Sequence, residues 1–435
     1  MRPHVLKRPE HPISRRDIDV TALKVLYRLI DAGFVAYLVG GAVRDLMLGR
    51  KPKDFDVGTT AHPNEVRALF RNSRLIGRRF PLVHVFFHGG RIVEVATFRA
   101  GRENAEVGDS GATLSLDNNF GTAEQDAFRR DFTINALFYD PKTFHVLDYV
   151  SGLADLRLKL VRTVGEPQLR MREDPVRMVR AVRLAAKLGF ELDPDLRTAI
   201  EVCRSQLLSA PPARLAEELY RMLAADGSAR GLGLMRELGL LEVLLPNWCR
   251  LLEGSSEAWE RTARNLQALE QARKSGADVS RSKILAALFA ELGMGEATGA
   301  EAQMQLVEEL RQRGFARAET ARVRLLLNAL SRLRTRRRLD RIARQPYYDE
   351  ARQLYAIVAP SYGLEAVVPT GVTTSQRLAS PVGVRRQRRV RRRRRAKQPT
   401  ISPLAHGSSE HASEALEQTT FNGASHLAAL ASPRT

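Results

Sequence analysis

The chain has 435 residues, of which 44% are hydrophobic, and a formal net charge of +20. This length is enough for two to four domains of ordinary size, and the positive charge indicates a polyanionic partner, either nucleic acid or an anionic membrane. Two cysteines, Cys203 and Cys249, are too few and too far apart for a disulfide framework or a cysteine-based zinc site, and they fit a reducing compartment. No secretory h-region and no apolar run of about 18 residues occur, which predicts a cytoplasmic protein that binds nucleic acid and no membrane.

The apolar pattern divides the chain into five predicted regions. Strand-like and helix-like patterns alternate in the first third, and amphipathic helical patterns follow. The C-terminal segment is rich in Ser, Thr, Pro and Arg and has too few large apolar residues to fold alone. The predicted class is α+β, with a small mixed-sheet head followed by an all-α body. The predicted regions are a flexible basic arm over residues 1–18, the head over 19–160, helical regions over 161–250 and 251–368, and a disordered Arg-rich tail over 369–435.

Helices and strands alternate within the predicted head. Gly33 ends the first helical pattern, and Pro63 lies near the start of the third. Residues 101–125 are rich in Gly, Asn, Asp and Ser and are predicted to be a mobile loop. The last two apolar segments are either two strands or a helix–strand pair. The predicted helices lie within 17–34, 42–49 and 62–70, and the apolar strand-like segments cover 35–39, 54–57, 82–87, 91–98, 132–140 and 145–150.

Asp54 and Asp56 are the first candidate site. If both lie on a strand, their side chains point to the same face, about 6.5 Å apart along the chain. Two such carboxylates repel each other unless a divalent cation lies between them, and oxygen ligands of this kind suit Mg²⁺. Two such ions can clamp a phosphoryl transfer. A solvated strand end is the alternative reading of the pair taken alone.

Glu94 is a third candidate acid. It lies between Val93 and Val95 on an otherwise apolar segment, where a charge is costly unless it is paired or bound to metal. It would complete a metal-binding triad with the two aspartates. The alternative is an exposed glutamate or a partner for a nearby arginine.

The stretch "LVGGAVRD" precedes the acid pair. Gly40 and Gly41 lie between a predicted strand and a predicted helix, where their backbone N–H groups can approach an anion. Arg44 follows one turn later and could reach the same phosphate. A plain strand–turn–helix connection is the alternative.

Two further charged stretches are candidates for nucleotide contacts. In "FRRDFTINAL", Arg129 and Arg130 fit triphosphate binding, and Asp131 could hold a ribose hydroxyl. A surface charge cluster is the alternative. The tail run "RRQRRVRRRRRAK" is predicted to bind RNA phosphates without sequence choice, unless it only solubilises the chain. Its arginines are Arg385, Arg386, Arg388, Arg389, Arg391, Arg392, Arg393, Arg394 and Arg395.

The stretch "REDPVRMVRAVR" predicts a helix with Asp174 as its N-cap and Pro175 at its first position. Arg177 and Arg180 then recur at a spacing of three. A carboxylate and a guanidinium fixed side by side can hydrogen-bond the edge of a base. The alternative is a capped helix with surface salt bridges.

Three stretches together closely resemble the class II nucleotidyltransferases of the polymerase-β superfamily, which include bacterial poly(A) polymerases and CCA-adding tRNA nucleotidyltransferases. They are "LVGGAVRDLMLGRKPKDFDV", "RRDFTINAL" and "REDPVRMVRAVRLAAKLGF", and the resemblance covers about residues 20–250. "LFRNSRLIGRRFPLVHV" over residues 69–85, "PPARLAEELYRML" and the Arg-rich tail look like the poly(A) polymerase branch. The chain lacks a P-loop motif and the adjacent His-Asp pair of some CCA-adding enzymes.

The resemblance implies a role for each matching residue. Asp54 and Asp56 would bind catalytic Mg²⁺, with Glu94 as an additional carboxylate, and Asp131 would be the third acid of the site. The helical region 161–250 would recognise the base, and 251–368 would bind RNA. The nucleotide would be held by Gly40, Gly41, Arg44, Arg130, Asp174, Arg177 and Arg180.

The implied activity is the addition of AMP from ATP to RNA 3′ ends, with release of pyrophosphate and without a template. Addition of CCA to tRNA is the nearest alternative. A non-catalytic RNA-binding protein on the same fold is the second. The expected partners are RNA 3′ ends and ATP, with RNA-decay or RNA-chaperone proteins as further candidates, and the chain is expected to be a monomer.

Overall fold

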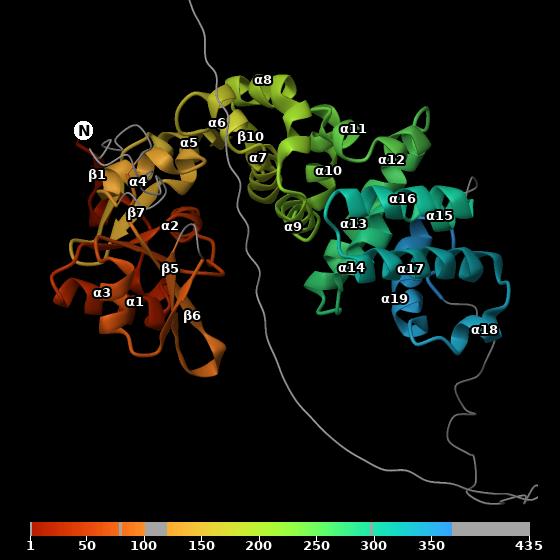
Figure 1. The fold of residues 1–435 in the computed structure, drawn as a ribbon, viewed down its shortest axis with the longest axis horizontal. Helices are drawn as coiled ribbons and strands as arrows, with labels where there is room; N and C mark the ends of the chain where they lie inside the picture. The colour runs from red at the N-terminus through yellow and green to blue at the C-terminus, as the bar shows by residue number, and fades with distance from the viewer. Residues whose placement is uncertain (1, 78–80, 101–119, 296–298, 368–435) are drawn as a thin grey trace, which may run out of the picture. The chain divides into compact units, whose positions relative to one another are not determined.

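The computed structural model describes residues 2–77, 81–100, 120–295 and 299–367 (Figure 1). The N-terminal part contains a mixed sheet with the strand order β1-β8-β7-β2-β3-β6-β5-β4. Strands β3 and β6 are parallel, and the other neighbours are antiparallel. The strands are β1 His4–Leu6, β2 Ala36–Val39, β3 Asp56–Thr59, β4 Ser73–Ile76, β5 Leu82–Phe86, β6 Ile92–Thr97, β7 Leu137–Asp140 and β8 His145–Asp148. This sheet confirms the predicted mixed-sheet head.

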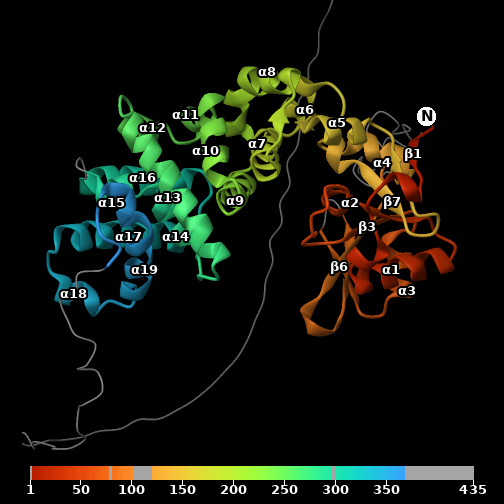
Figure 2. The ribbon, with the colours of Figure 1, turned by 180° about the vertical axis from the view of Figure 1, so that it is seen from behind.

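Helices α1 and α3 lie side by side and contact strands of this sheet (Figures 1 and 2). Val57 of β3, Val83 of β5 and Val93 of β6 pack in one core with Leu26 of α1 and Val66 of α3. Because successive side chains of a strand point to opposite faces, the residues next to each of these valines along its strand face away from both helices. The helices of the head are α1 Val20–Asp31, α2 Gly41–Met47, α3 Pro63–Leu69, α4 Ala123–Arg129 and α5 Gly152–Leu158.

Helix α1 shows how the sequence sets these elements. The Asp19 side chain accepts a hydrogen bond from the backbone N–H of Thr21 at 2.7 Å, which satisfies one of the free donors at the helix start. Its buried residues recur at helical spacing and form the face that packs on the sheet. Gly33, with φ of 90°, follows the helix in the left-handed region that favours glycine.

The remainder of the described chain is helical, apart from the short parallel pair of β9 Leu160–Val161 and β10 Glu191–Leu192. Helix α7 packs against α9 and α10, and α17 packs against α14, α15, α16 and α19. None of the helices in the described ranges is both long enough and apolar enough to cross a membrane. The helices are α6 Pro167–Glu173, α7 Val176–Leu188, α8 Pro194–Cys203, α9 Pro212–Leu223, α10 Ser228–Glu237, α11 Leu240–Leu244, α12 Pro246–Leu251, α13 Ser256–Lys274, α14 Arg281–Leu288, α15 Glu291–Met294, α16 Ala300–Gln312, α17 Arg317–Thr335, α18 Leu339–Ala343 and α19 Tyr348–Val358.

The predicted flexible arm over residues 1–18 is wrong for residues 2–18. Strand β1 pairs antiparallel with β8, and the side chains of Ile13 and Ile18 are buried. The ring nitrogen Nε2 of His11 lies 2.8 Å from the carbonyl oxygen of Phe144, which attaches the segment to the β7–β8 turn. A three-residue strand is too short to give a periodic signal, and the basic residues around it suggested a flexible arm instead.

Two other differences concern the middle of the head. Strand β4 was not predicted, and the predicted mobile loop over 101–125 ends too late. Helix α4 begins at Ala123, where Thr122 and Gln125 cap it through reciprocal hydrogen bonds. The rest of that prediction, over 101–119, lies outside the described residues, as does the predicted tail with its nine arginines.

Candidate active site

The Gly40–Gly41 turn joins β2 to α2. Gly40 has φ of 72° and ψ of −134°, a backbone conformation that residues with a Cβ rarely adopt. A Cβ there would lie 3.1 Å from Nη1 of Arg130, and a Cβ on Gly41 would lie 3.5 Å from Nη2 of Arg44. The two glycines therefore let two guanidinium groups, those of Arg44 and Arg130, approach the turn closely.

Arg44 is buried and already has partners within the head. Its Nε and Nη2 donate to Oδ1 of Asp45 at 2.8 and 2.6 Å, and its Nη1 donates to Oδ1 of Asn135 at 2.5 Å. Hydrogen bonds on both sides fix the plane of the guanidinium. Arg44 thus stands beside the turn in one orientation.

Asn135 connects Arg44 to the predicted third acid. Its Nδ2 donates to Oδ1 of Asp131 at 3.2 Å, while its own Oδ1 accepts from Arg44. On the other side, Nη2 of Arg180 in helix α7 lies 2.6 Å from Oδ2 of Asp131. An unbroken series of polar contacts therefore runs from the Gly-Gly helix through Asn135 and Asp131 to α7.

The surroundings of Asp131 favour its charged form. Burial alone would raise the pKa of this carboxyl. The positive charge of Arg180, the hydrogen bonds from Asn135 and the Phe132 N–H, and the charge of Arg130 together outweigh burial, so the pKa of Asp131 lies below its ordinary value. Asp131 is consequently a fixed negative charge at neutral pH.

Arg130 lies between the turn and the carboxylate of Asp126. Its Nη2 donates to Oδ2 of Asp126 at 2.8 Å, its Nη1 donates to the Asn135 carbonyl at 3.3 Å, and its guanidinium carbon lies 5.2 Å from the ring centroid of Phe138. This geometry holds the positive charge against Gly40.

The acid pair lies at the start of β3. Asp56 is the first residue of that strand and faces Val39 of β2 and Glu94 of β6 across the ladders. Asp54 is exposed and lies two residues before the strand, so the prediction that both aspartates lie on it is wrong. Burial, followed by the negative charges of Glu94 and Asp54, raises the pKa of Asp56 to about 6, although the charge of Arg130 lowers it. These carboxylates are therefore close enough to repel one another.

The predicted triad with Glu94 is wrong. The Glu94 side chain is 43% exposed, and its Oε2 lies 3.5 Å from Nε2 of His84 on the neighbouring strand. Among the residues that the structure describes, no group of three or more His, Cys, Asp or Glu side chains could hold a metal ion. Of the three carboxylates predicted to bind Mg²⁺, Asp54 and Asp56 therefore remain as the candidates.

Helix α7 differs from its prediction at its first turn. Asp174 is the C-cap of α6, and Pro175 is the N-cap of α7, where no side chain caps the helix. Asp174 lies 2.8 Å from Nη2 of Arg214 on α9, whereas Arg177 pairs with Glu173 at 3.0 Å. The predicted base-reading residues thus have separate partners, and Arg180 points to Asp131. The helix begins at Val176, one residue beyond the prediction, although Pro175 already has helical backbone angles of φ −59° and ψ −23°.

Comparison with known proteins finds similarity to one family. Residues 36–162 match the poly(A) polymerase head domain, and residues 189–252 match the probable RNA- and SrmB-binding site of polymerase A. Poly(A) polymerase I of Salmonella typhi is 48% identical over 299 residues, which are 66% of this chain and 64% of that protein. Over these segments the chain is similar to the class II nucleotidyltransferases. It spans just under two thirds of the length of that curated relative.

Both branches of the class II nucleotidyltransferases are represented among the relatives. The CCA-adding enzyme of Geobacillus stearothermophilus is 37% identical over 219 residues, which are 50% of this chain and 53% of that enzyme. A crystal structure of the Bacillus stearothermophilus CCA-adding enzyme in complex with CTP has a TM-score of 0.59 and 28% identity, and the match covers 79% of this chain and 80% of that one.

Sequence reasoning missed Asn135, which contacts two of the predicted site residues. The available signal was a polar side chain between Ile134 and Ala136, both of which are fully buried. A polar residue inside an apolar run needs partners, and here they are Arg44 and Asp131. Asp126 was missed for a different reason, because its only local signal was a spacing of four residues to Arg130, which is equally typical of a surface salt bridge.

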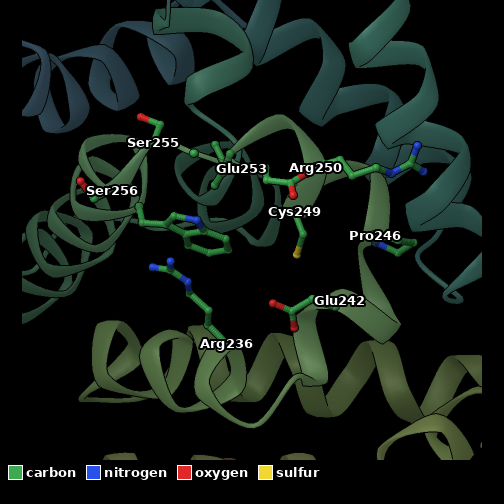
Figure 3. Close-up of a pocket in the computed structure, with 11 residues that line it drawn as sticks. Arg236, Glu242, Pro246, Cys249, Arg250, Glu253, Ser255 and Ser256 are labelled. Carbon is green, nitrogen blue, oxygen red and sulfur yellow. The ribbon is translucent and has the colours of Figure 1, made fainter.

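A separate cavity of about 620 Å³ lies between α10, α11, α12 and α13 (Figure 3). Arg236, Glu242 and Cys249 line it, and it includes none of the site residues predicted from the sequence. Burial, followed by the charges of Glu242 and Glu309, raises the pKa of the Cys249 thiol to about 12. The thiol is therefore protonated at neutral pH and is a poor nucleophile.

Proposed function

We propose that this chain is a template-independent poly(A) polymerase that adds AMP from ATP to RNA 3′ ends and releases pyrophosphate. The observation that carries this proposal is its 48% identity to a poly(A) polymerase I over 299 residues, against 37% over 219 residues to a CCA-adding enzyme. Because the two branches share their chemistry, this difference supports ATP as the nucleotide rather than CTP followed by ATP.

Asp54 and Asp56 are proposed to hold Mg²⁺. The raised pKa of Asp56 reflects burial and the charges of Glu94 and Asp54, and a divalent cation beside the pair would offset this repulsion. When bound, the metal would neutralise phosphate charge and favour deprotonation of the RNA 3′-hydroxyl. The carboxylates would orient the reacting groups, so positioning and charge neutralisation would supply most of the rate.

The Gly40–Gly41 turn is proposed to receive the triphosphate. Backbone N–H groups of the turn would approach the phosphate oxygens where a Cβ would obstruct them. Arg44 and Arg130 lie against the two glycines and would add positive charge on either side. Their carboxylate partners would keep both guanidinium groups in place before the nucleotide arrives.

Asp131 is proposed as the third acid of the site, with Arg180 holding its orientation from α7. Asp174 and Arg177 are proposed to recognise the base, because a carboxylate accepts hydrogen bonds and a guanidinium donates them. Asp174 ends α6 just before α7, and Arg177 lies in the first turn of α7, the helix that also supplies Arg180. RNA would be bound by the helical region 251–368 and by the arginines of the tail. A cytoplasmic monomer, with RNA-decay or RNA-chaperone proteins as partners, completes the proposal.

Offering each nucleoside triphosphate separately to the purified protein with Mg²⁺ and an oligo(A)-ended RNA tests this function. Long tails with ATP alone are expected. Incorporation of CTP that stops after two residues would instead indicate a CCA-adding enzyme, the activity named for the Bacillus stearothermophilus structure. RNA binding without incorporation of any nucleotide would indicate a non-catalytic RNA-binding protein.

A further inference from the structure

A second pocket of the head has the chemistry of a single-stranded RNA site. Its volume is about 490 Å³, and it lies where α1, the segment after α3 and the end of β5 meet. It is formed partly by residues 70–72, which belong to the poly(A) polymerase-like stretch 69–85 that has no role in the proposed active site. We call this the basic pocket, and its main lining residues are Lys24, Arg28, Phe70, Arg71, Phe86 and Phe87.

All the charged residues that line the basic pocket are positive. Lys24, Arg28 and Arg71 line it, and no carboxylate does. Lys24 and Arg28 are four residues apart on α1 and so lie on the same face of the helix. Over the described ranges, none of these three exposed cations has an ion pair, so their charges are available to an external anion.

Aromatic rings lie directly beside these cations. The guanidinium carbon of Arg28 lies 5.2 Å from the ring centroid of the buried Phe70, and the half-buried Phe87 also lines the pocket. Asn72 joins the start of β4 to the end of β5. Its Nδ2 donates to the Phe86 carbonyl at 2.8 Å, and its carbonyl accepts from the Phe86 N–H at 2.9 Å.

Phe86 alternates with Val85 along β5, and its ring lies beside His84 on the other face of the sheet. The flat surfaces open to a ligand are therefore the exposed guanidinium of Arg28 and the half-buried ring of Phe87. An unpaired nucleobase stacks on such surfaces, whereas an acidic peptide needs only the charge.

The basic pocket is separate from the active site. Val85 lines the pocket and packs in the core shared with α1 and α3. Asp56 and Glu94 alternate with Val57 and Val95 of that core, so their side chains point to the opposite face of the sheet. A molecule in the basic pocket would therefore contact residues that the acid pair does not touch.

We propose that the basic pocket binds single-stranded RNA, taking one base against its aromatic and guanidinium surfaces and adjacent phosphates against its cations. The bound nucleotides would lie upstream of the 3′ end that reacts. This inference rests on the proposed function only for the choice of RNA as the polyanion. A volume near 500 Å³ lies within the range of small-ligand sites and accommodates a nucleotide.

The test compares binding of a long oligo(A) RNA by the full chain and three variants over a series of salt concentrations. Lys24→Gln with Arg71→Gln removes two pocket cations, and Lys142→Gln with Arg157→Gln removes two exposed head cations that lie outside the pocket. The pocket variant is expected to lose affinity on the order of tenfold, and its salt slope is expected to fall by about 1.4, for two lost phosphate contacts. The control variant is expected to match the parent chain.

Arg28→Lys separates stacking from charge. It keeps the charge and removes the flat guanidinium, so affinity for oligo(A) is expected to fall several-fold with an unchanged salt slope. Parent-like affinity of this variant, or equal losses in the pocket and control variants, would overturn the proposal. Equal displacement of the RNA by poly-glutamate or by phosphatidylglycerol vesicles would do the same, because it would indicate a general polyanion surface. Primer extension by the parent chain is measured separately, so failure of the catalytic proposal is distinguishable from failure of this one.

Discussion

The basic residues of the head and of α7 fall into two sets that differ in their partners. Arg44, Arg130 and Arg180 each lie within 2.8 Å of a carboxylate of the chain. The cations of the basic pocket have no such partner among the residues that the structure describes. A paired guanidinium is held in one orientation, whereas an unpaired one is free to bind an anion from outside. This comparison supports the proposals that the first set positions the nucleotide and that the second binds RNA.

Breaking the paired set at its centre should have the largest effect. Asp131→Asn leaves Arg180 without its carboxylate and weakens the acceptor for Asn135. Loss of this partner is expected to lower the free energy of unfolding by about 1–3 kcal/mol, and the misplaced site is expected to lose on the order of 100-fold in AMP incorporation. Chemical denaturation and initial rates of primer extension measure the two effects. Asp17→Asn, an exposed aspartate of the same head, serves as the control and should change neither.

The same variant gives a pH dependence with a defined sign. The pKa of Asp131 is lower in the folded chain than in the unfolded one, so its contribution to stability is present above its unfolded value of about 3.9. It is lost as the pH falls through the folded value. The stability difference between the parent chain and Asp131→Asn should thus be constant near neutral pH and shrink below about pH 4. A difference that grows on acidification would contradict this account of Asp131.

Asn135 tests whether the series of contacts needs an amide. Asn135→Asp keeps an acceptor for Arg44 but places a second negative charge about 3 Å from Asp131, whereas Asn135→Leu removes both hydrogen bonds. Each substitution is expected to lower the free energy of unfolding by about 1–2 kcal/mol and to raise KM for ATP, because the positions of Arg44 and Asp131 are no longer linked.

The control for that experiment is Asn64→Asp on the exposed surface of α3, which should stay within about 0.5 kcal/mol of the parent chain. An unchanged KM in both Asn135 variants, with stability lowered as expected, would reduce Asn135 to a purely structural residue.

A smaller effect on stability is expected from a substitution at the cap of α1, which lies outside the candidate active site. Asp19→Ala removes the cap of α1, the helix that carries two cations of the basic pocket, and should lower the free energy of unfolding by about 1 kcal/mol. Asp19→Asn keeps the capping oxygen and loses only the charge facing Arg91, so it should recover most of this loss. Asp31→Ala at the other end of the helix is the control. Equal losses in Asp19→Ala and Asp19→Asn would assign the effect to Arg91 and not to the cap.

The predictable parts of the head were those with a local signal. The helix α1, the Gly-Gly turn and the paired strands β5 and β6 followed from apolar spacing and from Gly and Pro positions. Strand β1 did not, because three residues give no period and its partner β8 lies more than a hundred residues away. Pairing at that distance is decided by packing rather than by the segment itself.

The candidate site divides in the same way. The residue types at Gly40, Asp56 and Asp131 indicated the chemistry, but their partners came from elements remote in sequence. The contact of Arg180 with Asp131 joins residues 49 positions apart, and the separation of Asp174 from Arg177 depends on Arg214 of α9. The spacing of these residues predicted neighbouring positions, whereas contacts with other elements gave Asp174 and Arg180 different partners.

The most direct test of the central claim is the rate of AMP incorporation into an oligo(A) primer by the parent chain, Asp54→Asn and Asp56→Asn, with Mg²⁺ and ATP. Both substitutions remove a proposed metal ligand with almost no change in volume, so the fold should be kept, as circular dichroism and denaturation would verify. The account predicts extension by the parent chain and a loss of at least about 1,000-fold in each variant. Extension at the parent rate by either correctly folded variant would contradict it.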